Sequence, residues 1–441
     1  MHFQMKQFAI NKFLKMMESA KWQAGQFATF KIFPKWLQFV TSQFLCSSYI
    51  KYASQTTEEV LDKLTTDGRL KTVLSAFGGD LGESIGEGSF VMQAAVLGHV
   101  LEGCYYPQGG PIQFVRGLIP TIQSTPGGEG NVFVNARVDQ ILVDDVNTNN
   151  KGKKHCDGMD DDDDTSNDQH ALINKPFVHR VRLANGDVLS SRLGVVSDCG
   201  FRTTLKLLPK NILDRHRDGS AKGSGLSRLI DSVEQSSGGI SHVFCFVGLN
   251  ATNEELNLKS SSYYYIPWND TDDTTGIDMD ATEIQDFYRN TLLDPTVEDV
   301  SAGIVFASAK DPIYSREVMP GKSTVIIFSE AKTDDFRQFI PNPGKPSPCG
   351  GGRSSRIQGP RTKGYEQAKK LIEKKMIRSL LLNFPHLEPY IDIVEVGTPL
   401  TLFDYTRRFE TLGLRHTPQR MCDMELRPAC EELPGLYFTG T

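Results

Sequence analysis

The fold of this chain is indicated by one stretch of its first half, VHRVRLANGDVLSSRLGVVSDCG at residues 178–200. Apolar and polar residues alternate on both sides of Asn185-Gly186, and Asn-Gly is a strong signal for a type I′ turn, so the stretch predicts a β-hairpin. The apolar residues from Gly194 to Ser197 then predict a short buried strand. FVNARVDQILV at 133–143 shows the same alternation and follows a helical segment, which indicates an α/β protein.

Further helical and strand patterns lie on either side of this stretch. A Thr N-cap at residue 56, with acidic residues behind it, predicts two short helices within 56–74. Helical spacing predicts longer helices at 89–102, from the end of YYPQGG (105–110) through Gln123, and at 365–384. In the second half a mixed sheet with helices to one side is predicted from HVFCFVGL (242–249), SYYYIP (262–267), GIVFASA (303–309) and STVIIFS (323–329). At 441 residues the chain is too long for one ordinary core, so we expect two domains.

Composition and charge narrow the classes of function. The formal charge of −6 and the isoelectric point of about 5.9 argue against nucleic acid as a main partner, because phosphate binding needs a basic face. The eight cysteines are scattered without a Cys-x-x-Cys pair and the nine histidines are dispersed, so we expect no metal site. Such cysteines suit a reducing compartment or thiols that are buried as small apolar groups. No hydrolase motif is present. An acidic, solvated loop is predicted at 157–168 and a flexible, low-complexity loop at 341–364.

The N-terminal segment, residues 1–52, differs from the rest in charge and aromatic content. It holds seven lysines and a single acid, and bulky apolar residues recur at helical spacing, namely Phe33, Trp36, Leu37, Val40 and Phe44. We favour a stripe that packs on the chain's own domain, as in most amphipathic helices, over one that lies on a membrane surface. With no 18-residue apolar run and no secretory signal, we expect an intracellular protein without a transmembrane span. A peripheral contact of residues 1–52 with an endoplasmic reticulum or plastid membrane stays open.

Six motifs follow one another from about Tyr49 to the last residue. They are GCYYPQGGPIQFVRGLIPTIQ (103–123), VNARVDQILVDD (134–145), GVVSDCGFRTTLKLLP (194–209), FASAKDPIY (306–314), MPGKST (319–324) and LPGLYFTG (433–440). In this order and spacing they resemble the all-trans-retinol 13,14-reductase (retinol saturase) and carotenoid isomerase family of FAD-dependent oxidoreductases. The first and last motifs are shared with phytoene desaturases, whereas Ser-Ala-Lys-Asp-Pro at 308–312 and MPGKST favour the retinol saturase branch.

The resemblance implies an α/β fold of the amine oxidase/phytoene desaturase type, in which an incomplete FAD/NAD(P)-binding Rossmann-like domain is interleaved with an α+β substrate domain. The implied parts are a helical substrate-side region (1–124), part of the FAD-binding domain (125–205), the substrate domain (206–400) and a return to the FAD-binding domain (401–441). Family members begin with a strand, Gly-x-Gly-x-x-Gly and a helix that hold the flavin pyrophosphate, and this chain has no such motif. They also continue beyond the final Thr-Gly, so we expect a truncated FAD-binding domain.

The resemblance also assigns a cofactor-binding set at three strand ends. The set comprises a residue beside the flavin adenine, three beside the pyrophosphate, where a glycine permits close backbone approach, and two at the start of the C-terminal flavin-contacting motif. In that order the residues are Val138, then Ser197, Cys199 and Gly200, then Thr439 and Gly440.

Between substrate and flavin the resemblance places the YYPQGG segment. Gly109 and Gly110 resemble the join between the substrate cavity and the flavin, with a plain turn and helix cap as the equally weighted alternative. Tyr105 or Tyr106 is the candidate proton donor.

The implied activity is that of an oxidoreductase acting on CH–CH groups. Flavin N5 would exchange a hydride with one carbon–carbon double bond of a retinoid or carotenoid-like polyene, with NAD(P)H as a candidate reductant. The partner is therefore an apolar isoprenoid. Two alternatives stay open, a carotenoid cis–trans isomerase and a truncated, non-catalytic binding protein. The second follows because a chain without the glycine motif lacks hydrogen bonds that hold the FAD pyrophosphate.

Overall fold

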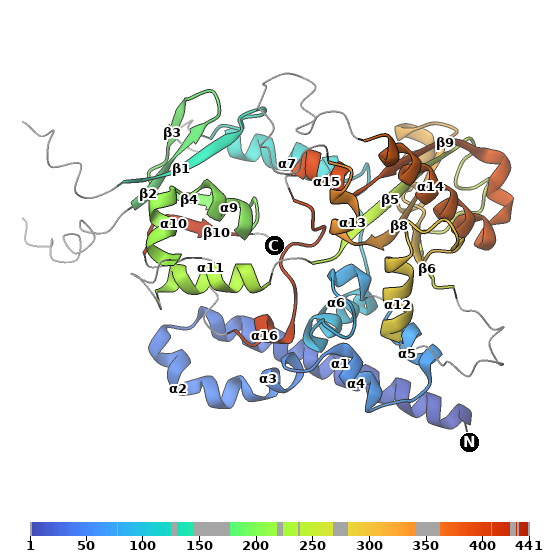
Figure 1. Ribbon diagram of the computed structural model, residues 1–441, viewed down its shortest axis with the longest axis horizontal. Helices are drawn as coiled ribbons and strands as arrows, with labels where there is room; N and C mark the ends of the chain where they lie inside the picture. Colours follow the sequence, from blue (N-terminus) through green and yellow to red (C-terminus); the bar gives the residue numbers. More distant parts are fainter. Residues whose placement is uncertain are drawn as a thin grey trace, which may run out of the picture. The chain divides into compact units, whose positions relative to one another are not determined.

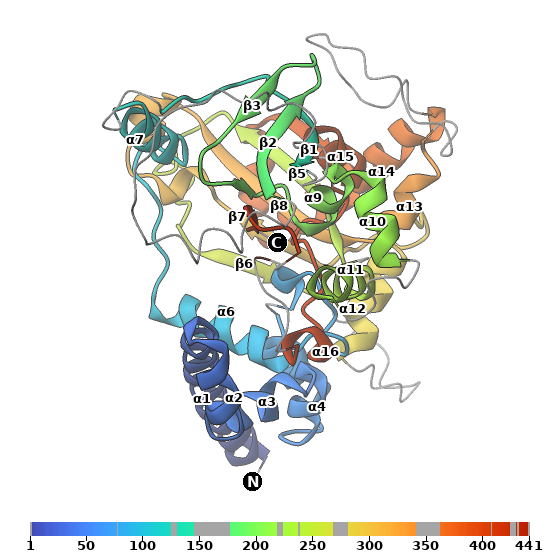
Figure 2. The same cartoon turned by 90° about the vertical axis from the view of Figure 1, so that its left-hand side faces the viewer.

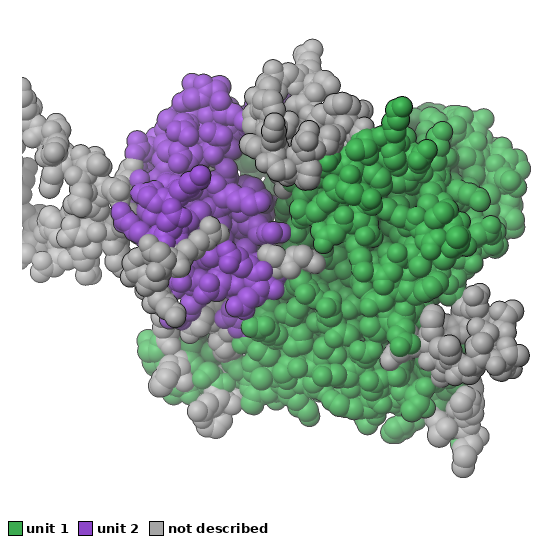
Figure 3. Space-filling view, in the orientation of Figure 1, with its two compact units in different colours: residues 1–130, 238–422 green, residues 131–237, 423–441 purple. Residues whose placement is uncertain are grey.

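The computed structural model describes most of the chain, and the described residues are 2–76, 78–124, 130–144, 177–217, 224–236, 239–267, 281–340, 362–406, 408–423, 429 and 432–439. The chain forms two compact units: unit 1 is residues 1–130 with 238–422, and unit 2 is residues 131–237 with 423–441 (Figure 3). The division made from the sequence, at 124/125, 205/206 and 400/401, is likewise interleaved. The predicted acidic loop and residues 341–361 of the predicted flexible loop lie outside the described residues.

Unit 1 begins with helices that pack around α6. The elements up to residue 124 are α1 (His2–Ile32), α2 (Lys35–Leu45), α3 (Ser47–Ala53), α4 (Thr57–Asp62), α5 (Gly68–Leu74), the 3-10 turn η1 (Gly79–Leu81), α6 (Phe90–Glu102) and α7 (Ile112–Gln123) (Figure 1). Phe13 and Met17 of α1 are buried in one cluster with Phe90 and Ala94 of α6. Figure 2 shows α1 beside α6, so the first helix packs on its own unit.

The predicted pair of short helices after residue 56 is confirmed. Thr56 Oγ1 accepts a hydrogen bond from the Glu59 N–H at 3.2 Å, and the Glu59 carboxylate accepts one from the Thr56 N–H at 3.1 Å. This reciprocal capping box satisfies two backbone donors that a helix start would otherwise leave without partners.

The predicted apolar stripe at residues 33–44 is covered only in part. Trp36 and Val40 on α2 are 70% and 62% exposed, whereas Phe30 near the end of α1 is buried. The expectation that this stripe packs on its own unit is therefore wrong for Trp36 and Val40, because α1 rather than α2 supplies the packed face. In the described part of the chain, we find no helix with the length and apolar character needed to cross a membrane.

The main sheet of unit 1 has five strands in the order β6-β7-β8-β5-β9. The strands are β5 (Ser241–Leu249), β6 (Ser262–Tyr265), β7 (Ala302–Val305), β8 (Ser323–Ala331) and β9 (Ile391–Gly397). Every neighbouring pair is antiparallel, so the predicted mixed sheet is wrong in strand direction. Parallel neighbours need crossover connections, and the pattern of apolar stretches does not reveal which strands pair.

One face of this sheet forms the largest core. Alternate strand residues such as Val243, Ile304 and Ile327 pack with Ile372 and Met376 of α14 (Lys363–Asn383). The helix begins at Lys363, inside the segment predicted as a flexible loop, with Thr362 as its N-cap. The remaining elements of unit 1 are α12 (Ala281–Asn290), η4 (Ser308–Lys310), the π-helical η5 (Tyr314–Val318), α13 (Thr333–Arg337), η6 (Pro385–Tyr390), α15 (Pro399–Thr406) and α16 (Pro418–Met421).

Unit 2 contains the stretch that indicated the fold. Its elements are β1 (Val138–Asp144), β2 (Phe177–Leu183), β3 (Val188–Ser190), β4 (Val195–Ser197), α9 (Phe201–Leu207), α10 (Lys210–Arg217), α11 (Gly225–Gln235) and β10 (Leu436–Phe438). Strands β1, β2 and β3 form an antiparallel sheet, and β4 pairs with β10 in parallel. Strands and helices in both units confirm the α/β prediction.

The predicted hairpin exists, but its turn is of another type. The Gly186 N–H donates to the Leu183 carbonyl at 2.9 Å, and Gly186 has φ of 95° while Asn185 has no positive φ. A type I′ turn needs positive φ at both central residues, so this is a three-residue loop with glycine in the left-handed position. The strand after it is also less buried than predicted, since Val196 is 69% exposed.

Candidate functional site

The first candidate site lies at the carboxyl ends of the two parallel strands of unit 2. Phe438 of β10 pairs with Ser197 of β4, and the next residue, Thr439, donates its N–H to the Ser197 carbonyl at 3.0 Å. Two segments far apart in the sequence thus end side by side. In open α/β sheets, ligands bind in the crevice outside such strand ends.

Side-chain contacts shape the turn that follows β4. The Ser197 hydroxyl lies 2.7 Å from Thr204 Oγ1 and 3.2 Å from Cys199 Sγ, and Thr204 Oγ1 donates to the Gly200 carbonyl at 2.9 Å. Gly200 has φ of 78°, which a side chain would strain, and it directly precedes α9. Ser197 is buried and positions the turn, whereas Cys199 is exposed at its surface.

The structure brings four residues of the predicted cofactor set together, namely Ser197, Cys199, Gly200 and Thr439. Val138 lies elsewhere in unit 2, at the start of β1, opposite Leu183. Gly440 lies outside the described residues.

Two glycines that sequence reasoning did not single out bring the strands close together. A Cβ on Gly194 would lie 2.3 Å from the Gly435 carbonyl oxygen, and a Cβ on Gly435 would lie 2.3 Å from the Val178 carbonyl oxygen. Both positions therefore require glycine. The signal in the sequence was the glycine inside each strand motif, GVVS and LPGLY.

Three features meet at these strand ends. An exposed thiol, a left-handed glycine and the end of β10 lie together at the position where open α/β sheets bind their ligands. The glycine-rich turn that binds pyrophosphate in such folds is not among the residues of this chain.

The second candidate site is the YYPQGG segment of unit 1. The Gly109 N–H donates to Asp311 Oδ2 at 2.9 Å, and the Ile313 N–H donates to Asp311 Oδ1 at 3.2 Å. Gly109 and Gly110 both have positive φ, at 82° and 83°. The buried Asp311 thus holds the glycine pair, which joins two motifs that the sequence had separated by about two hundred residues.

The two neighbouring tyrosines differ in their surroundings. Tyr105 is 95% exposed, whereas Tyr106 is 40% exposed. Partial burial, with the nearby Asp311 and Tyr314, raises the pKa of Tyr106, which keeps its hydroxyl protonated. Of the predicted pair, Tyr106 is the one that the structure surrounds with other groups.

A third feature, which sequence reasoning missed, is a small polar cavity in unit 1 of about 50 Å³. It lies between α12, Asp80 of η1, and the strands β5 to β8. Its polar lining includes Asp80, His242, Tyr264, Gln285, Arg289 and Glu330. The Tyr264 hydroxyl donates to Asp80 Oδ2 at 2.5 Å.

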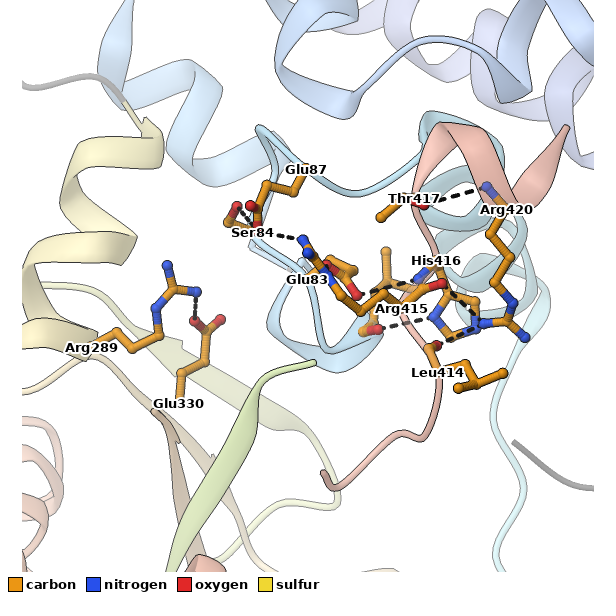
Figure 4. Close-up of polar contacts among 11 residues, drawn as sticks. Glu83, Ser84, Glu87, Arg289, Glu330, Leu414, Arg415, His416, Thr417 and Arg420 are labelled. Atoms are coloured by element: carbon orange, nitrogen blue, oxygen red, sulfur yellow. Dashed lines mark hydrogen bonds and ion pairs between the residues drawn. The ribbon is translucent and has the colours of Figure 1, made fainter. Parts of the chain in front are cut away.

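The charges around this cavity are unevenly matched. Burial raises the pKa of Glu330 to about 7, with Asp80 and Glu83 acting in the same direction and Arg289 against them. Arg289 Nη1 lies 3.5 Å from Glu330 Oε2 (Figure 4). Arg289 also pairs with Asp286. Three buried atoms of the lining have no hydrogen-bond partner among the described residues, and they are Gln285 Oε1, Arg289 Nε and Glu330 Oε2. Such atoms mark places where a bound group can complete the contacts.

Local signals for the cavity were present but weak. Glu330 is the one charged residue of STVIIFSEA and lies on the less buried face of β8, and Asp80 lies in the glycine-rich FGGDLGESIGEG. The five-strand order that joins them is not visible in either pattern.

A neighbouring polar network in unit 1 connects two segments of the chain. Glu83 accepts from Arg415 Nε at 3.0 Å and from the His416 N–H at 3.2 Å, and Arg415 also pairs with Glu87 at 2.7 Å (Figure 4). Arg420 Nη1 donates to the carbonyls of Leu414 and Arg415. The network ties residues 83–87 to residues 414–420.

Together, these observations define a mixed α/β protein with three candidate sites. No family model matches the chain. It is 26% identical to the all-trans-retinol 13,14-reductase of Danio rerio over 400 residues and to that of Homo sapiens over 406, in both cases 89% of this chain and 55% of the relative. An "inactive all-trans-retinol 13,14-reductase" of Danio rerio is 22% identical over 98% of this chain and 62% of the relative.

These similarities, at 24–26% identity, support the resemblance to the retinol saturase family that the motifs indicated. The chain spans about half the length of the curated relatives it matches. Among solved structures, an oxidoreductase from Methanosarcina mazei is similar with a TM-score of 0.47 and 11% identity, covering 93% of this chain and 69% of that chain.

Proposed function

We propose that this protein is an oxidoreductase that reduces a carbon–carbon double bond of a retinoid. The observation that carries the proposal is the similarity over 89% of the chain to proteins named all-trans-retinol 13,14-reductase. The contact of Gly109 with Asp311 supports it, because it joins the more widely shared YYPQGG motif to Ser-Ala-Lys-Asp-Pro at 308–312, which favours the retinol saturase branch.

We further propose that FAD is the cofactor and NAD(P)H the source of electrons. The convergence of Ser197, Cys199, Gly200 and Thr439 at parallel strand ends supports a dinucleotide site there. When bound, the flavin supplies the hydride. The residues of this chain would position it: Ser197 holds the turn, and Cys199, Gly200 and Thr439 form the edge that it contacts.

Reduction of a double bond also needs a proton, and we propose that Tyr106 supplies it. A donor must be protonated at the working pH, a condition that a tyrosine hydroxyl meets, and Tyr106 is chosen because it is partly buried near Asp311 and Tyr314. Tyr105 is a matched comparison, since it precedes Tyr106 directly and is 95% exposed. Tyr106→Phe should lower the rate by about a hundredfold or more, whereas Tyr105→Phe should leave it nearly unchanged.

A membrane contact through residues 1–52 forms part of the proposal, because retinoids are apolar and partition into lipid. The exposed Trp22, Trp36 and Val40 support it, together with the lysines of the same segment. We propose a peripheral position on an intracellular membrane such as the endoplasmic reticulum. Flotation with liposomes, with Trp22→Ala and Trp36→Ala variants, tests the contact.

A second function, a non-catalytic retinoid-binding protein, is favoured by the relative named inactive, which matches 98% of this chain. A cis–trans isomerase is the third candidate. One experiment separates the three: purified protein, FAD and NADPH are incubated with all-trans-retinol, and the product is analysed by mass. A gain of two hydrogens supports the reductase, a changed retention time at unchanged mass supports the isomerase, and saturable binding without any product supports the binding protein.

A further inference from the structure

The face of the unit 1 sheet opposite its core carries a row of aromatic residues. Tyr264, Gly303, Phe328 and Phe244 are successive cross-strand neighbours on β6, β7, β8 and β5. Phe246, one pair further along β5, stacks on Phe244 with 6.1 Å between ring centroids, and it is 45% exposed. With neighbouring strands about 4.8 Å apart, the row crosses three spacings, or about 14 Å. We call it the aromatic row.

A glycine sets the arrangement of this row. A Cβ on Gly303 would lie 2.2 Å from Phe328 Cζ, so the Phe328 ring lies directly over the glycine. The ring also meets Tyr264 edge to face, with centroids 6.3 Å apart. An apolar path of this kind suits an extended isoprenoid chain.

The aromatic row overlaps the small cavity, because Tyr264, Gly303 and Phe328 line both, whereas Phe244 and the adjacent Phe246 continue the row beyond the lining. At about 50 Å³ the cavity has room for a few water-sized groups and none for a polyene. Only the end of a ligand fits inside it, while the remainder has to lie outside, along the row.

The polar atoms of the cavity favour one kind of end group. Gln285 Oε1 and Glu330 Oε2 are acceptors and Arg289 Nε is a donor, and none of the three has a hydrogen-bond partner among the described residues. An alcohol donates one hydrogen bond and accepts others, so it matches this set. A carboxylate only accepts, and it would meet the two acids Glu330 and Asp80 against the single cation Arg289, which already pairs with Glu330 and Asp286.

We propose that the cavity binds the hydroxyl end of a polyene alcohol, that the aromatic row carries its chain, and that Glu330 with Gln285 selects the alcohol against the corresponding acid. The inference rests on the proposed function, since it assigns the end of the same substrate. Glu330 and Gln285 are specificity residues, and neither is placed at the reacting double bond.

The test is retinoid binding by the purified protein near pH 8, where Glu330 is ionised, without a reductant. All-trans-retinol is titrated by its own fluorescence, and all-trans-retinoic acid is measured by displacement of retinol. We expect the wild type to prefer retinol by about tenfold or more. Glu330→Gln should bind retinoic acid about tenfold more tightly and thus narrow the preference, because the repelling charge is gone.

Two further variants keep the result interpretable. Gln285→Met retains the volume but loses the amide acceptor, and it should weaken retinol binding about fivefold or more without improving retinoic acid. Glu298→Gln removes an acid that is 60% exposed elsewhere in unit 1, and it should change neither affinity. Circular dichroism confirms that each variant is folded.

The outcomes separate this inference from the proposed function. An unchanged retinol-to-acid ratio in folded Glu330→Gln, or no saturable retinoid binding at all, overturns the assignment of the cavity. Reduction of retinol by a protein whose ratio does not respond to Glu330 leaves the reductase standing and removes only the cavity. The expected ratios with no reduction under any conditions would uphold the cavity and overturn the reductase.

Discussion

Two polar clusters in unit 1 each contain a glutamate with little exposure, 2% for Glu83 and 17% for Glu330, and they differ in how that glutamate is partnered. Glu83 receives one donor on each carboxylate oxygen, from Arg415 and from the His416 backbone. Glu330 has one loose ion pair with Arg289, at 3.5 Å, and no hydrogen bond on the same oxygen. Figure 4 shows both clusters.

This difference distinguishes a cluster that stabilises the fold from one that is suited to bind a ligand. A buried charge with good partners on both oxygens offsets its desolvation and ties chain segments together. A buried charge with a poor partner beside a cavity carries an uncompensated cost that a ligand can relieve. We therefore assign the Glu83 cluster to stability and the Glu330 cluster to binding, and the variants below test that division.

The largest effect is expected from breaking the well-partnered cluster. Arg415→Ala leaves Glu83, whose side chain is 2% exposed, as a buried charge without its cation, and this should lower the free energy of unfolding by about 3 to 5 kcal/mol. Chemical denaturation measures it. Arg378→Ala is the control, because this arginine is 44% exposed and its pairs with Asp299 and Glu298 should be worth about 1 kcal/mol or less. Equal losses in the two variants would contradict the division.

In the poorly partnered cluster, removing the charge of Glu330 should raise the free energy of unfolding above pH 7. The pKa of Glu330 rises from 4.5 to about 7 on folding, so the folded state binds the extra proton and wild-type stability falls as pH rises from about 4.5 to 7. Glu330→Gln removes that fall and should be more stable above pH 7 by at most about 3 kcal/mol. Denaturation midpoints of wild type and variant across this range measure it. A variant less stable than wild type near pH 8 would show that Glu330 is a structural residue.

His416 sharpens the comparison because its pH dependence has the other sign. Burial, with Arg420 nearby, lowers the pKa of His416 from 6.5 to about 4, so its neutral form stabilises the fold above about pH 6.5 and this contribution is lost as pH falls toward 4. The effect is roughly 2 to 3 kcal/mol. In wild type it opposes the Glu330 effect between pH 4.5 and 6.5. His416→Gln should therefore show a steeper fall of stability with rising pH than wild type, measured by the same denaturation series.

The sequence predicted the features that short segments determine. The capping box at Thr56 and Glu59 follows from residues three apart, and the family motifs pointed to Ser197 and Thr439, which the structure places next to each other. The turn at Asn185-Gly186 was predicted as a hairpin but with the wrong turn type, because Asn185 does not adopt positive φ. The roles of Ser197, Cys199, Gly200 and Thr439 toward FAD stay predictions.

The cavity could not be predicted from the sequence, and the reason is physical. Asp80, Tyr264, Arg289 and Glu330 come from four separate segments, and each is an ordinary residue in its own segment. They meet only because antiparallel pairing places β6, β7, β8 and β5 side by side and α12 packs against β8. Sheet order depends on contacts between residues distant in sequence, which local periodicity does not encode.

The smallest effect is expected at the edge of the cavity, where one hydrogen bond is lost without leaving a new charge. Tyr264→Phe removes the hydroxyl that donates to Asp80. Burial raises the pKa of Asp80 and this hydrogen bond lowers it, so in the variant the Asp80 carboxyl should take up a proton at a higher pH. We expect a loss of about 1 kcal/mol near neutral pH that shrinks as the pH is lowered and Asp80 becomes neutral. Tyr265→Phe on the same strand is the matched control, measured by the same denaturation series. A loss as large as that of Arg415→Ala would place Tyr264 and Asp80 in the structural cluster, because a cavity poised for a ligand should tolerate the loss of one of its own hydrogen bonds.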